Sequence, residues 1–504
     1  MTTMIGPLRR AVAVAPDAVA AHCGTTEVTY AQTYERARRL VGALRELGVG
    51  DGDRVAVVGR NCHRYLELYQ AVPGAGMVLV PLNQRHTASE LAYALEDSGA
   101  RVLFVASGID YPDGIVEHVI DLGEGYEALL AGAPAAEFPD ALPGDTMAGL
   151  FYTGGTTGAA KGVILTHRNL VANAFHFQAQ FAFRPDTSWL VAAPLFHAAG
   201  SIAVLATVWH GAGHVMLPVF DAAAALELIE THRVTATLVV PTMLAALGEE
   251  QLARPREVSS LRLLSHGGSP VATETLRRAR HAFPGAELMH LYGTTETAPI
   301  ATIMAHEEAL LDAPQARSCG QPAIGVEVRV LDDETGQTAA AGVVGEVLIR
   351  GENVMAGYWN KAEATAAAVL DGWYRTGDLG YMDERAFLYL VDRAKDMIVT
   401  GGENVYSTEV EEVLYGHPAV LEAAVFGIPD ARWGEAVHAV VVPRGDVAEA
   451  DLVAHCRGAI ADYKIPKRIE LTTDPLPKSG AGKVLKRELR APYWTGHESV
   501  VGGA

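Results

Sequence analysis

Cysteine is scarce in this sequence, with four residues in 504, and the four lie far apart without a Cys-x-x-Cys spacing. This scarcity argues against a disulfide framework and against a structural zinc site, and it favours a reducing, cytoplasmic location. Positive charge is also scarce, because 40 lysines and arginines face 60 acidic residues and leave a formal net charge of −20. Such a charge repels phosphate backbones and anionic bilayers at long range, so we do not expect nucleic acid as a main partner.

Long hydrophobic runs are missing as well. Near the N-terminus, Pro16 and Asp17 interrupt the apolar run before it reaches the length of a signal-peptide core. Residues 190–220 carry no formally charged side chain, but two prolines and three histidines divide them. This pattern predicts a buried helix with flanking strands rather than a membrane span. We expect no integral membrane segment, while peripheral membrane contact and a homodimer are both compatible with the sequence.

Helical and strand patterns alternate from residue 28 onward. This alternation indicates an α/β fold with parallel sheets, and such folds place ligands at the carboxyl ends of their strands. From about residue 320 the rhythm changes to short strands with glycine turns, which predicts an antiparallel sheet or a small barrel. We therefore expect a large N-terminal domain of stacked βα subdomains plus a small barrel in residues 1–392. A hinge at residues 393–396 and a small α+β domain in residues 397–504 would complete the chain.

The strongest local signal is the segment YTGGTTGAAKG, residues 152–162. Glycines let backbone N–H groups approach an anion, hydroxyls donate further hydrogen bonds, and a lysine supplies positive charge. The segment is not a GxxxxGK[ST] P-loop, because Ala160 replaces the second glycine and Gly162 follows the lysine. It predicts a phosphate-binding loop formed by Thr153, Gly154, Gly155, Thr156, Thr157, Gly158 and Lys161.

This segment resembles the signature loop of the adenylate-forming superfamily. That superfamily includes acyl-CoA and aryl-CoA synthetases, nonribosomal peptide adenylation domains and beetle luciferases. The usual loop is close to [ST]SGTTGxPKG, from which this chain departs at Gly154 and Ala160. Further motifs follow in the order of the family, so the resemblance covers nearly the whole chain. It is greatest to the fatty-acid and aryl-acid CoA ligases.

Three motifs resemble the nucleotide site of the family. In YGTTE, residues 292–296, the resemblance implies an aromatic ring against adenine, a threonine on phosphate and a magnesium ligand, Glu296. Mg²⁺ bound to ATP typically needs only one or two protein carboxylates. In YRTGD it implies that Asp378 accepts both ribose hydroxyls, which suits a group with only acceptor sites. The GGSP segment resembles the family's segment that lines adenine and the acyl pocket. The candidate nucleotide-site residues from the three motifs are Gly267, Gly268, Ser269, His290, Leu291, Tyr292, Gly293, Thr294, Thr295, Glu296 and Asp378.

The segment VDRAKDMIVTGGENVYSTEVE, residues 391–411, is similar to the interdomain hinge of the family. The resemblance implies that Arg393 contacts ribose or phosphate and that Lys395 is the pivot of a mobile small domain. LPKSGAGKVLKREL, near the C-terminus, resembles the element that delivers the adenylation lysine, here Lys483. The loop after the hinge would give a pantetheine arm close access to the backbone, with Gly401, Gly402 and Glu403 as its candidate residues.

PLFHAAG, residues 194–200, resembles the segment at the acyl pocket, where His197 would bound the site. Gly293 stands where acetate-specific relatives carry a pocket-closing tryptophan, and Leu291 where malonate-specific relatives carry an arginine. The resemblance therefore implies a fatty, alicyclic or aryl monocarboxylate. The candidate lining is apolar with a few polar groups and comprises Ala199, Val240, Ser265, His266, His290, Ala298 and Pro299.

Together the motifs imply an ATP-dependent, AMP-forming acid–CoA ligase, an acyl-CoA synthetase with two half-reactions. The carboxylate first attacks the α-phosphorus of Mg·ATP and gives acyl-adenylate and pyrophosphate. The small domain then rotates, and the CoA thiolate displaces AMP. The implied cofactors are ATP, Mg²⁺ and coenzyme A. Two alternatives stay open: an acyl-AMP ligase that loads the phosphopantetheine of a carrier protein, and a luciferase-like oxidative relative.

Overall fold

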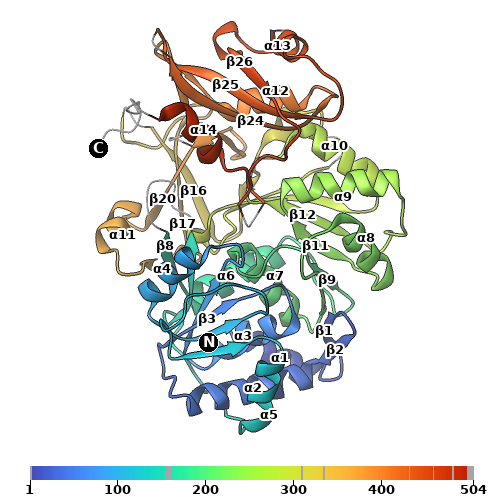
Figure 1. Cartoon of the computed structure of the whole chain (residues 1–504), viewed down its shortest axis with the longest axis vertical. Coiled ribbons are helices and arrows are strands. Elements are labelled where there is room, and N and C mark those ends of the chain that lie inside the picture. Colours follow the sequence, from blue (N-terminus) through green and yellow to red (C-terminus); the bar gives the residue numbers. More distant parts are fainter. Residues whose placement is uncertain are drawn as a thin grey trace.

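Four sheets organise the chain, which is seen here as a computed structural model. The structure describes residues 3–153, 160–307, 310–332, 335–393, 396–430, 432–457, 459–479 and 482–495. Three of the sheets are built before residue 394, and the fourth is built after residue 396. In Figure 1 the fourth sheet lies above the other three.

The first sheet has seven strands and lies in the lower part of Figure 1. Its strands are β3 (Arg54–Val58), β4 (Val78–Leu82), β5 (Ala100–Val105), β6 (His118–Asp121), β7 (Met147–Thr153), β8 (Lys161–Thr166) and β18 (Gly357–Tyr358). Their order is β18-β8-β7-β4-β3-β5-β6, with parallel pairing from β7 to β6 and antiparallel pairing at β8 and β18. Nearly continuous apolar strand sequences, such as RVAVV in β3, are typical of a parallel sheet that is covered on both faces.

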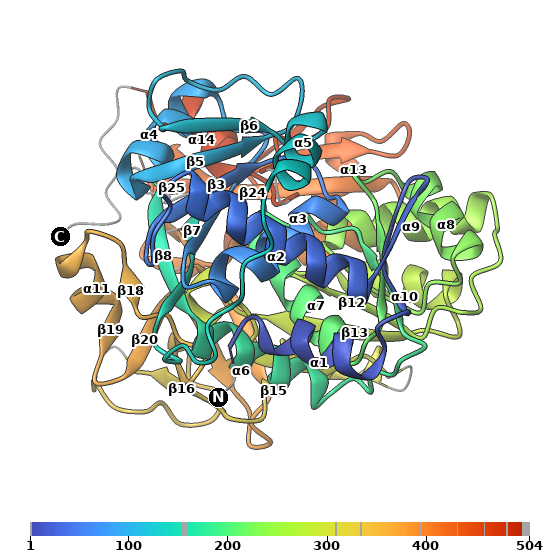
Figure 2. The same ribbon diagram turned by 90° about the horizontal axis from the view of Figure 1, so that it is seen from below.

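The helices of the lower part are α1 (Gly6–Val14), α2 (Tyr30–Glu46), α3 (His63–Gly74), α4 (Ala88–Ser98), α5 (Glu124–Gly132) and α6 (His167–Gln178). Of these, α3, α4, α5 and α6 pack against strands of this sheet. Figure 2 shows α2 crossing the underside of the molecule, where it contacts α1, α3 and α5. The sequence starts several of these helices with capping boxes, in which Thr29 and Gln32 of α2 and Thr87 and Glu90 of α4 satisfy each other's backbone N–H groups.

The second sheet has nine strands in the order β15-β14-β13-β12-β11-β9-β10-β1-β2. Their bounds are β1 (Val19–Cys23), β2 (Thr26–Thr29), β9 (Ser188–Val191), β10 (Gly213–Met216), β11 (Ala236–Val239), β12 (Leu263–Gly267), β13 (Glu287–Tyr292), β14 (Thr302–Ala305) and β15 (Gln321–Pro322). The strands from β1 to β13 in this order run parallel, so the carboxyl ends of β11, β12 and β13 meet at one edge. Its helices are α7 (Ala198–Trp209), α8 (Ala222–Thr231), α9 (Pro241–Ala253) and α10 (Thr273–Ala282).

The prediction for residues 190–220 is confirmed, because α7 lies between β9 and β10 as a helix with flanking strands. Most of the helix is buried against α1 and α6. Within the described residues, no helix is long and apolar enough to cross a bilayer.

The third sheet is antiparallel, as the glycine-punctuated rhythm predicted. It contains β16 (Val326–Leu331), β17 (Gly345–Gly351), β19 (Val369–Leu370), β20 (Trp373–Met382) and β21 (Leu388–Arg393). Between β17 and β19 the chain forms β18, the edge strand of the first sheet, and then helix α11 (Ala362–Ala368). Strand β20 pairs with β17, β19 and β21, and its register sets Asp378 opposite Arg393.

The fourth sheet belongs to the C-terminal part of the chain. It contains β22 (Ile398–Thr400), β23 (Glu403–Val405), β24 (Val420–Asp430), β25 (Gly434–Pro443) and β26 (Arg468–Leu471), with helices α12 (Ser407–Tyr415), α13 (Glu449–Arg457) and α14 (Lys486–Trp494). Helices α12 and α14 pack on β24. The division of the chain at 392, with a hinge at 393–396, stays a prediction.

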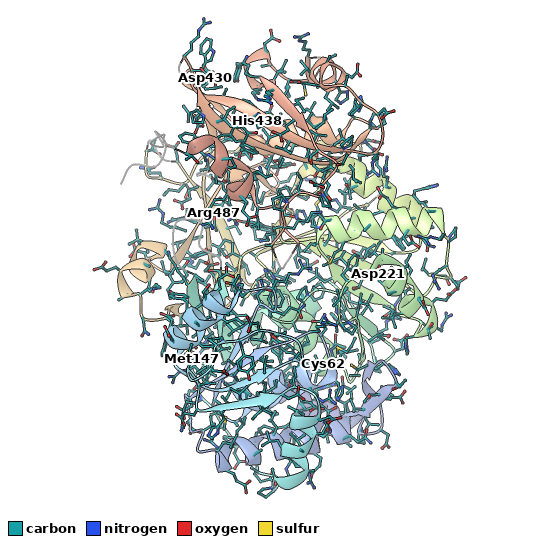
Figure 3. All side chains as sticks on the ribbon, in the orientation of Figure 1. Cys62, Met147, Asp221, Asp430, His438 and Arg487 are labelled. Carbon is teal, nitrogen blue, oxygen red and sulfur yellow. The ribbon has the colours of Figure 1, made fainter. Side chains whose placement is uncertain are left out.

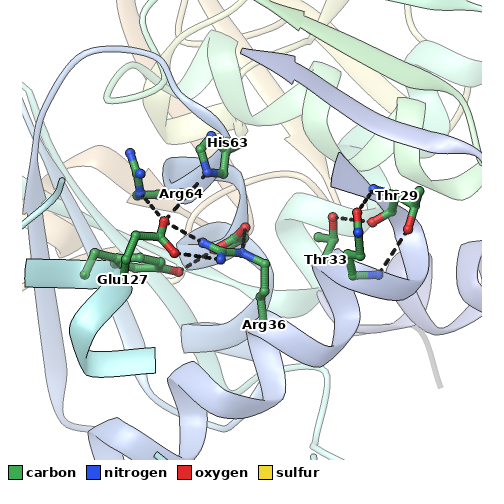
Figure 4. Close-up of polar contacts among 9 residues, drawn as sticks. Thr29, Thr33, Arg36, His63, Arg64 and Glu127 are labelled. Atoms are coloured by element: carbon green, nitrogen blue, oxygen red, sulfur yellow. Dashed lines mark hydrogen bonds and ion pairs between the residues drawn. The ribbon is translucent and has the colours of Figure 1, made fainter. Parts of the chain in front are cut away.

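A buried charge network ties α2 to α3 and α5 (Figure 4). The guanidinium of Arg36 donates to Glu67, with Nε 2.7 Å from Oε1, and to Glu127, with Nη1 2.8 Å from Oε2. Glu67 is only 1% exposed and also accepts a hydrogen bond from Tyr126. Hydrogen bonds from Arg36 and Arg64 lower the pKa of Glu127 to about 2. The buried carboxylate of Glu67 therefore depends on Arg36 for its compensating charge.

Replacing Arg36 by methionine should lower the free energy of unfolding by about 3–5 kcal/mol, because it leaves the charge of Glu67 buried without its partner. The matched control is Arg39→Met on the same helix, whose ion pair with Glu35 is exposed and worth about 0.5 kcal/mol or less. Urea unfolding of both variants measures the difference. Equal small effects would show that Glu67 does not need Arg36.

Candidate active site

A cleft of about 2480 Å³ opens between the second sheet, the third sheet and the C-terminal part. Its walls include the carboxyl ends of β11, β12 and β13, where an α/β fold places ligands. In Figure 3, Arg487 lies between the upper and lower parts of the molecule, and this side chain lines the cleft. The sequence candidates that line the cleft are Thr153, Lys161, His197, Gly267, Gly268, Ser269, His290, Leu291, Tyr292, Gly293, Thr294, Thr295, Glu296, Asp378, Arg393 and Lys483.

Other candidates do not reach the cleft or cannot be placed. The turn between β22 and β23, with Gly401, Gly402 and Glu403, is exposed and does not line the cleft. Their expected role at the pantetheine arm stays a prediction. Outside the described residues lie Gly154, Gly155, Thr156, Thr157, Gly158 and Lys395.

Asp378 on β20 is a buried carboxylate, 4% exposed, at the junction of the second and third sheets. Its Oδ2 accepts a hydrogen bond of 2.8 Å from the hydroxyl of Tyr292, and its Oδ1 lies 3.1 Å from Nε of Arg393. Burial and the nearby carboxylate raise the pKa of Tyr292 well above its ordinary value, so this phenol stays a donor. A carboxylate has about four acceptor sites, so roughly two are left for a diol.

Two candidate glycines are explained by backbone packing. A Cβ on Gly267 would lie 2.2 Å from the carbonyl oxygen of Leu291, and one on Gly293 would lie 1.8 Å from that of Pro299. A larger residue at either position would force β12, β13 and the following turn apart. Gly293 is therefore needed to keep two backbone segments in contact. This explanation of the glycine differs from the pocket-opening role that the sequence suggested.

Glu296 lies in the cleft with a partner that sequence reasoning missed. The hydroxyl of Tyr358 donates to its Oε1 at 2.8 Å, and the ring of Tyr358 lies under Lys161, with Nζ 4.9 Å from the centroid. Among the described residues, no group of three or more acidic, histidine or cysteine side chains could hold a metal. A single carboxylate fits Mg²⁺ that takes its other ligands from ATP phosphates and water.

Lys483 reaches into the cleft from the C-terminal part. Its Cε lies 3.6 Å from the position that a Cβ would take on Gly268, beside β12. The neighbouring carbonyl of Gly482 accepts a hydrogen bond of 3.4 Å from Thr242 of α9. Burial and the charge of Lys483 lower the pKa of His197 to about 3, so this imidazole is neutral at ordinary pH. The lysine and the histidine thus line the same cleft, close enough for the charge of one to act on the other.

Further polar contacts hold the C-terminal part in this orientation. Glu412 on α12 accepts a hydrogen bond of 2.8 Å from Thr273 on α10, and Arg444 pairs with Glu249 on α9. Sequence reasoning missed these residues because their partners lie more than a hundred positions away and no local motif marks them.

Three buried histidines stack at the wall of the cleft, and one of them, His290, lines it. The ring of His266 on β12 lies 4.9 Å from that of His290 on β13 and 5.3 Å from that of His306, which follows β14. Burial lowers the pKa of His290 to about 4 and that of His306 to about 3. The expectation that His266 lines the acyl pocket is wrong, since it is fully buried. Of the other expected lining residues, Ser265 and Ala298 also miss the cleft, whereas Ala199, Val240, His290 and Pro299 reach it.

The stack predicts a loss of stability in acid. A histidine whose pKa is lowered by folding binds protons more readily in the unfolded chain. Its contribution to the free energy of unfolding is therefore complete above about pH 6.5 and falls as the pH drops toward 3. For His306 the loss of unfolding free energy is roughly 2–3 kcal/mol at pH 4.5. His306→Phe should keep the stacking and lose less stability between pH 7 and pH 4.5 than the unchanged protein, measured by urea unfolding. The exposed His281→Phe is the control, and parallel pH profiles for all three proteins would contradict the prediction.

Comparisons with known proteins agree with this geometry. The family model for AMP-binding enzyme matches residues 8–359, and that for AMP-binding enzyme C-terminal domain matches residues 409–483. A feruloyl-CoA synthase from Amycolatopsis is 41% identical over 97% of this chain and 98% of its own. The fatty acid–[acyl-carrier-protein] ligase ScoC from Streptomyces coeruleorubidus is 35% identical over 95% of this chain and 94% of its own.

Among solved structures, the chain is similar to o-succinylbenzoate CoA synthetase (MenE) from Bacillus subtilis in complex with the acyl-adenylate intermediate OSB-AMP. The TM-score is 0.88 at 33% identity, with 97% of this chain and 98% of that chain covered. The family matches take in the phosphate loop, the YGTTE turn and the C-terminal lysine. The chain therefore belongs to the AMP-binding enzymes, the adenylate-forming superfamily.

Proposed function

We propose that the acid activated by this enzyme is an aromatic monocarboxylate. The chain is an ATP-dependent, AMP-forming acid–CoA ligase, as its family and its CoA-ligase relatives indicate. The observation that carries the narrower proposal is 41% identity to a feruloyl-CoA synthase over nearly the full length of both chains. The o-succinylbenzoate relatives also act on an acid that contains a ring.

The acyl end of the cleft supports this choice. Beside His197 the cleft is lined by Ala199, Val240 and Pro299, which offer apolar surface to a ring. Leu291, where an arginine would neutralise a second carboxylate, is an apolar residue only 6% exposed. Burying an unpaired carboxylate at this end would be costly, which favours a monocarboxylate.

Nucleotide binding follows from the groups described above. Tyr292 would lie against adenine, Asp378 would accept the ribose hydroxyls, and Arg393 would contact ribose or phosphate. Lys161 and Thr295 would bind the phosphates. These roles are supported by the position of all five side chains along one cleft and by the ion pair that orients Arg393 toward Asp378.

Lys483 would carry the first half-reaction. Its ammonium would bind both the acid carboxylate and the α-phosphate, bringing two anions together and offsetting their repulsion. Bound Mg²⁺, with Glu296 as its protein ligand, would neutralise charge on the phosphate oxygens. His197 has a lowered pKa and so adds no positive charge of its own. Catalysis would therefore rest on positioning and charge neutralisation.

The second half-reaction would need another orientation of the C-terminal part. In the orientation described, Lys483 lies in the cleft and the Gly401 turn lies outside it. Rotation about Lys395 would withdraw the lysine and bring Gly401 and Gly402 to the cleft, where the CoA thiol displaces AMP. Glycines in this turn would let pantetheine approach the backbone closely.

A carrier protein is the second candidate acceptor. It is favoured by 35% identity to a fatty acid–[acyl-carrier-protein] ligase over 95% of this chain. The first proposal stands ahead of it because the feruloyl-CoA synthase is closer in sequence. The cytoplasmic location, the homodimer and peripheral membrane contact stay predictions.

Assay of the purified protein with Mg·ATP and a panel of hydroxycinnamic, benzoic, alicyclic and fatty acids tests the proposal. We expect aromatic acids to give the highest kcat/KM, with AMP and CoA thioester formed in equal amounts, read by mass spectrometry. The control reactions omit CoA or supply a phosphopantetheinylated carrier protein instead. A preference for fatty acids would overturn the acid class. Acyl transfer to the carrier alone would overturn the acceptor, and oxygen consumption would indicate the oxidative alternative.

Lys483→Ala should lower the rate of acyl-adenylate formation by about 1000-fold, because a contact worth on the order of 4 kcal/mol before desolvation is lost. Thioester formation from supplied acyl-adenylate should stay close to that of the unchanged enzyme. Pyrophosphate exchange measures the first step, and Lys467→Ala, at an exposed lysine that does not line the cleft, controls for loss of one charge. Equal losses in both half-reactions would refute the role of Lys483.

A further inference from the structure

Tyr358 joins two charged groups of the cleft that come from different sheets, since Lys161 begins β8 and Glu296 follows β13. Its hydroxyl donates 2.8 Å to Oε1 of Glu296, and the ammonium of Lys161 lies 4.9 Å from its ring centroid. The tyrosine is 9% exposed, so its ring and hydroxyl are largely fixed by packing. One side chain thus contacts both the proposed metal ligand and the lysine of the phosphate loop.

The backbone around Tyr358 is tied to the same two elements. The N–H of Met355 donates 2.8 Å to the carbonyl of Glu296, and the N–H of Trp359 donates 2.8 Å to the carbonyl of Gly162, next to Lys161. Tyr358 itself pairs across β18 and β8 with Val163, and its N–H donates to Thr365. Residues 355–359 therefore form a bridge from the Glu296 turn to the phosphate-loop strand.

The chemistry of the phenol suits a fixed donor. A tyrosine hydroxyl has an ordinary pKa of about 10, so it keeps its proton at neutral pH and can donate to Glu296. A hydrogen bond to an ionised carboxylate is stronger than a neutral one and fixes the carboxylate's rotation. Among the described residues no ion pair joins Glu296 to Lys161, and Glu296 lines the cleft with the other oxygen of its carboxylate outside the bond to Tyr358.

We propose that Tyr358 is a positioning residue for the metal and phosphate site. Through its hydroxyl it holds Glu296 in the orientation that binds Mg²⁺, and through its ring it holds Lys161 apart from Glu296. This inference rests on the proposed role of Glu296 as magnesium ligand. Without the tyrosine, the carboxylate would turn freely and could pair with the lysine, and Mg²⁺ would have to break that pair before binding.

Metal affinity tests the hydroxyl directly. The affinity for Mn²⁺ in the presence of α,β-methylene-ATP is measured by the electron paramagnetic resonance of free Mn²⁺. Tyr358→Phe should weaken the affinity for Mn²⁺ about tenfold, which is a usual effect of removing a group that orients a metal ligand. The control is Tyr493→Phe, which removes a tyrosine–glutamate hydrogen bond of similar length, 2.7 Å, outside the cleft. An unchanged Mn²⁺ affinity in Tyr358→Phe would overturn the proposal.

A double-mutant cycle tests whether Tyr358 acts through Glu296. In a Glu296→Gln background the metal ligand is already impaired, so adding Tyr358→Phe should change the Mn²⁺ affinity less than twofold. A full tenfold loss in that background would show that the tyrosine acts by another route and would overturn the proposal.

A leucine variant separates the ring from the hydroxyl. At saturating Mg²⁺, Tyr358→Phe keeps the ring under Lys161 and should bind the ATP analogue nearly as well as the unchanged enzyme. Tyr358→Leu loses the cation–ring contact and should bind it several-fold more weakly. Equal affinities of the two variants would refute the role of the ring.

The half-reactions distinguish positioning from general damage. Both variants should form thioester from supplied acyl-adenylate at the normal rate, because that step needs no Mg·ATP. Equal losses in adenylation and thioester formation would indicate damage to the fold and overturn the proposal. If the unchanged enzyme activates no acid at all, the proposed function fails, whereas the Mn²⁺ measurement still decides the role of Tyr358.

Discussion

The buried carboxylate of Asp378 is the constraint on which the nucleotide site depends. Burying a charge is costly unless partners compensate it, and here they come from two different elements. Tyr292 ends β13 in the second sheet, and Arg393 ends β21, which is set opposite Asp378 by strand register. The second and third sheets are therefore held in one relative position by the same group that would bind ribose. Fold and site share this interaction.

Local charge in the cleft opposes the charge of the whole protein. A net charge of −20 disfavours the approach of an anion such as ATP, so binding must come from cations concentrated at one place. Lys161, Arg393 and Lys483 supply them from three separate segments that meet along the cleft. Lys161 lies on the ring of Tyr358, and Arg393 pairs with Asp378. Groups of the protein itself therefore set the positions of Lys161 and Arg393 along the cleft.

The contacts between the C-terminal part and the rest of the chain are polar and dispersed. Glu412 with Thr273, and Arg444 with Glu249, lie at the rim and remain partly exposed. Such pairs are individually weak, because water and salt screen them and ordering the side chains costs entropy. The proposed rotation between the two half-reactions would need contacts that define an orientation without making it permanent. This interface has that character, in contrast to the buried Arg36 network, whose partial loss would leave an uncompensated charge.

The sequence by itself determined the groups whose chemistry is carried by short segments. Short motifs mark the phosphate loop, the YGTTE turn, Asp378 and Lys483. Each motif is recognisable because a close approach of the backbone to a ligand, a tight turn or a lysine at a set position requires particular residue types at a fixed spacing. The alternation of helices and strands also indicated the α/β class, because the spacing of apolar residues along each segment shows which of its faces is buried. Only the tertiary structure decided the roles of Tyr358, His266 and Glu412. Tyr358 meets Glu296 because an edge strand pairs with β8, and His266 leaves the pocket because its face of β12 is covered by neighbouring rings. Such contacts join residues far apart in the chain, and strand register and domain orientation, which no local pattern encodes, bring them together.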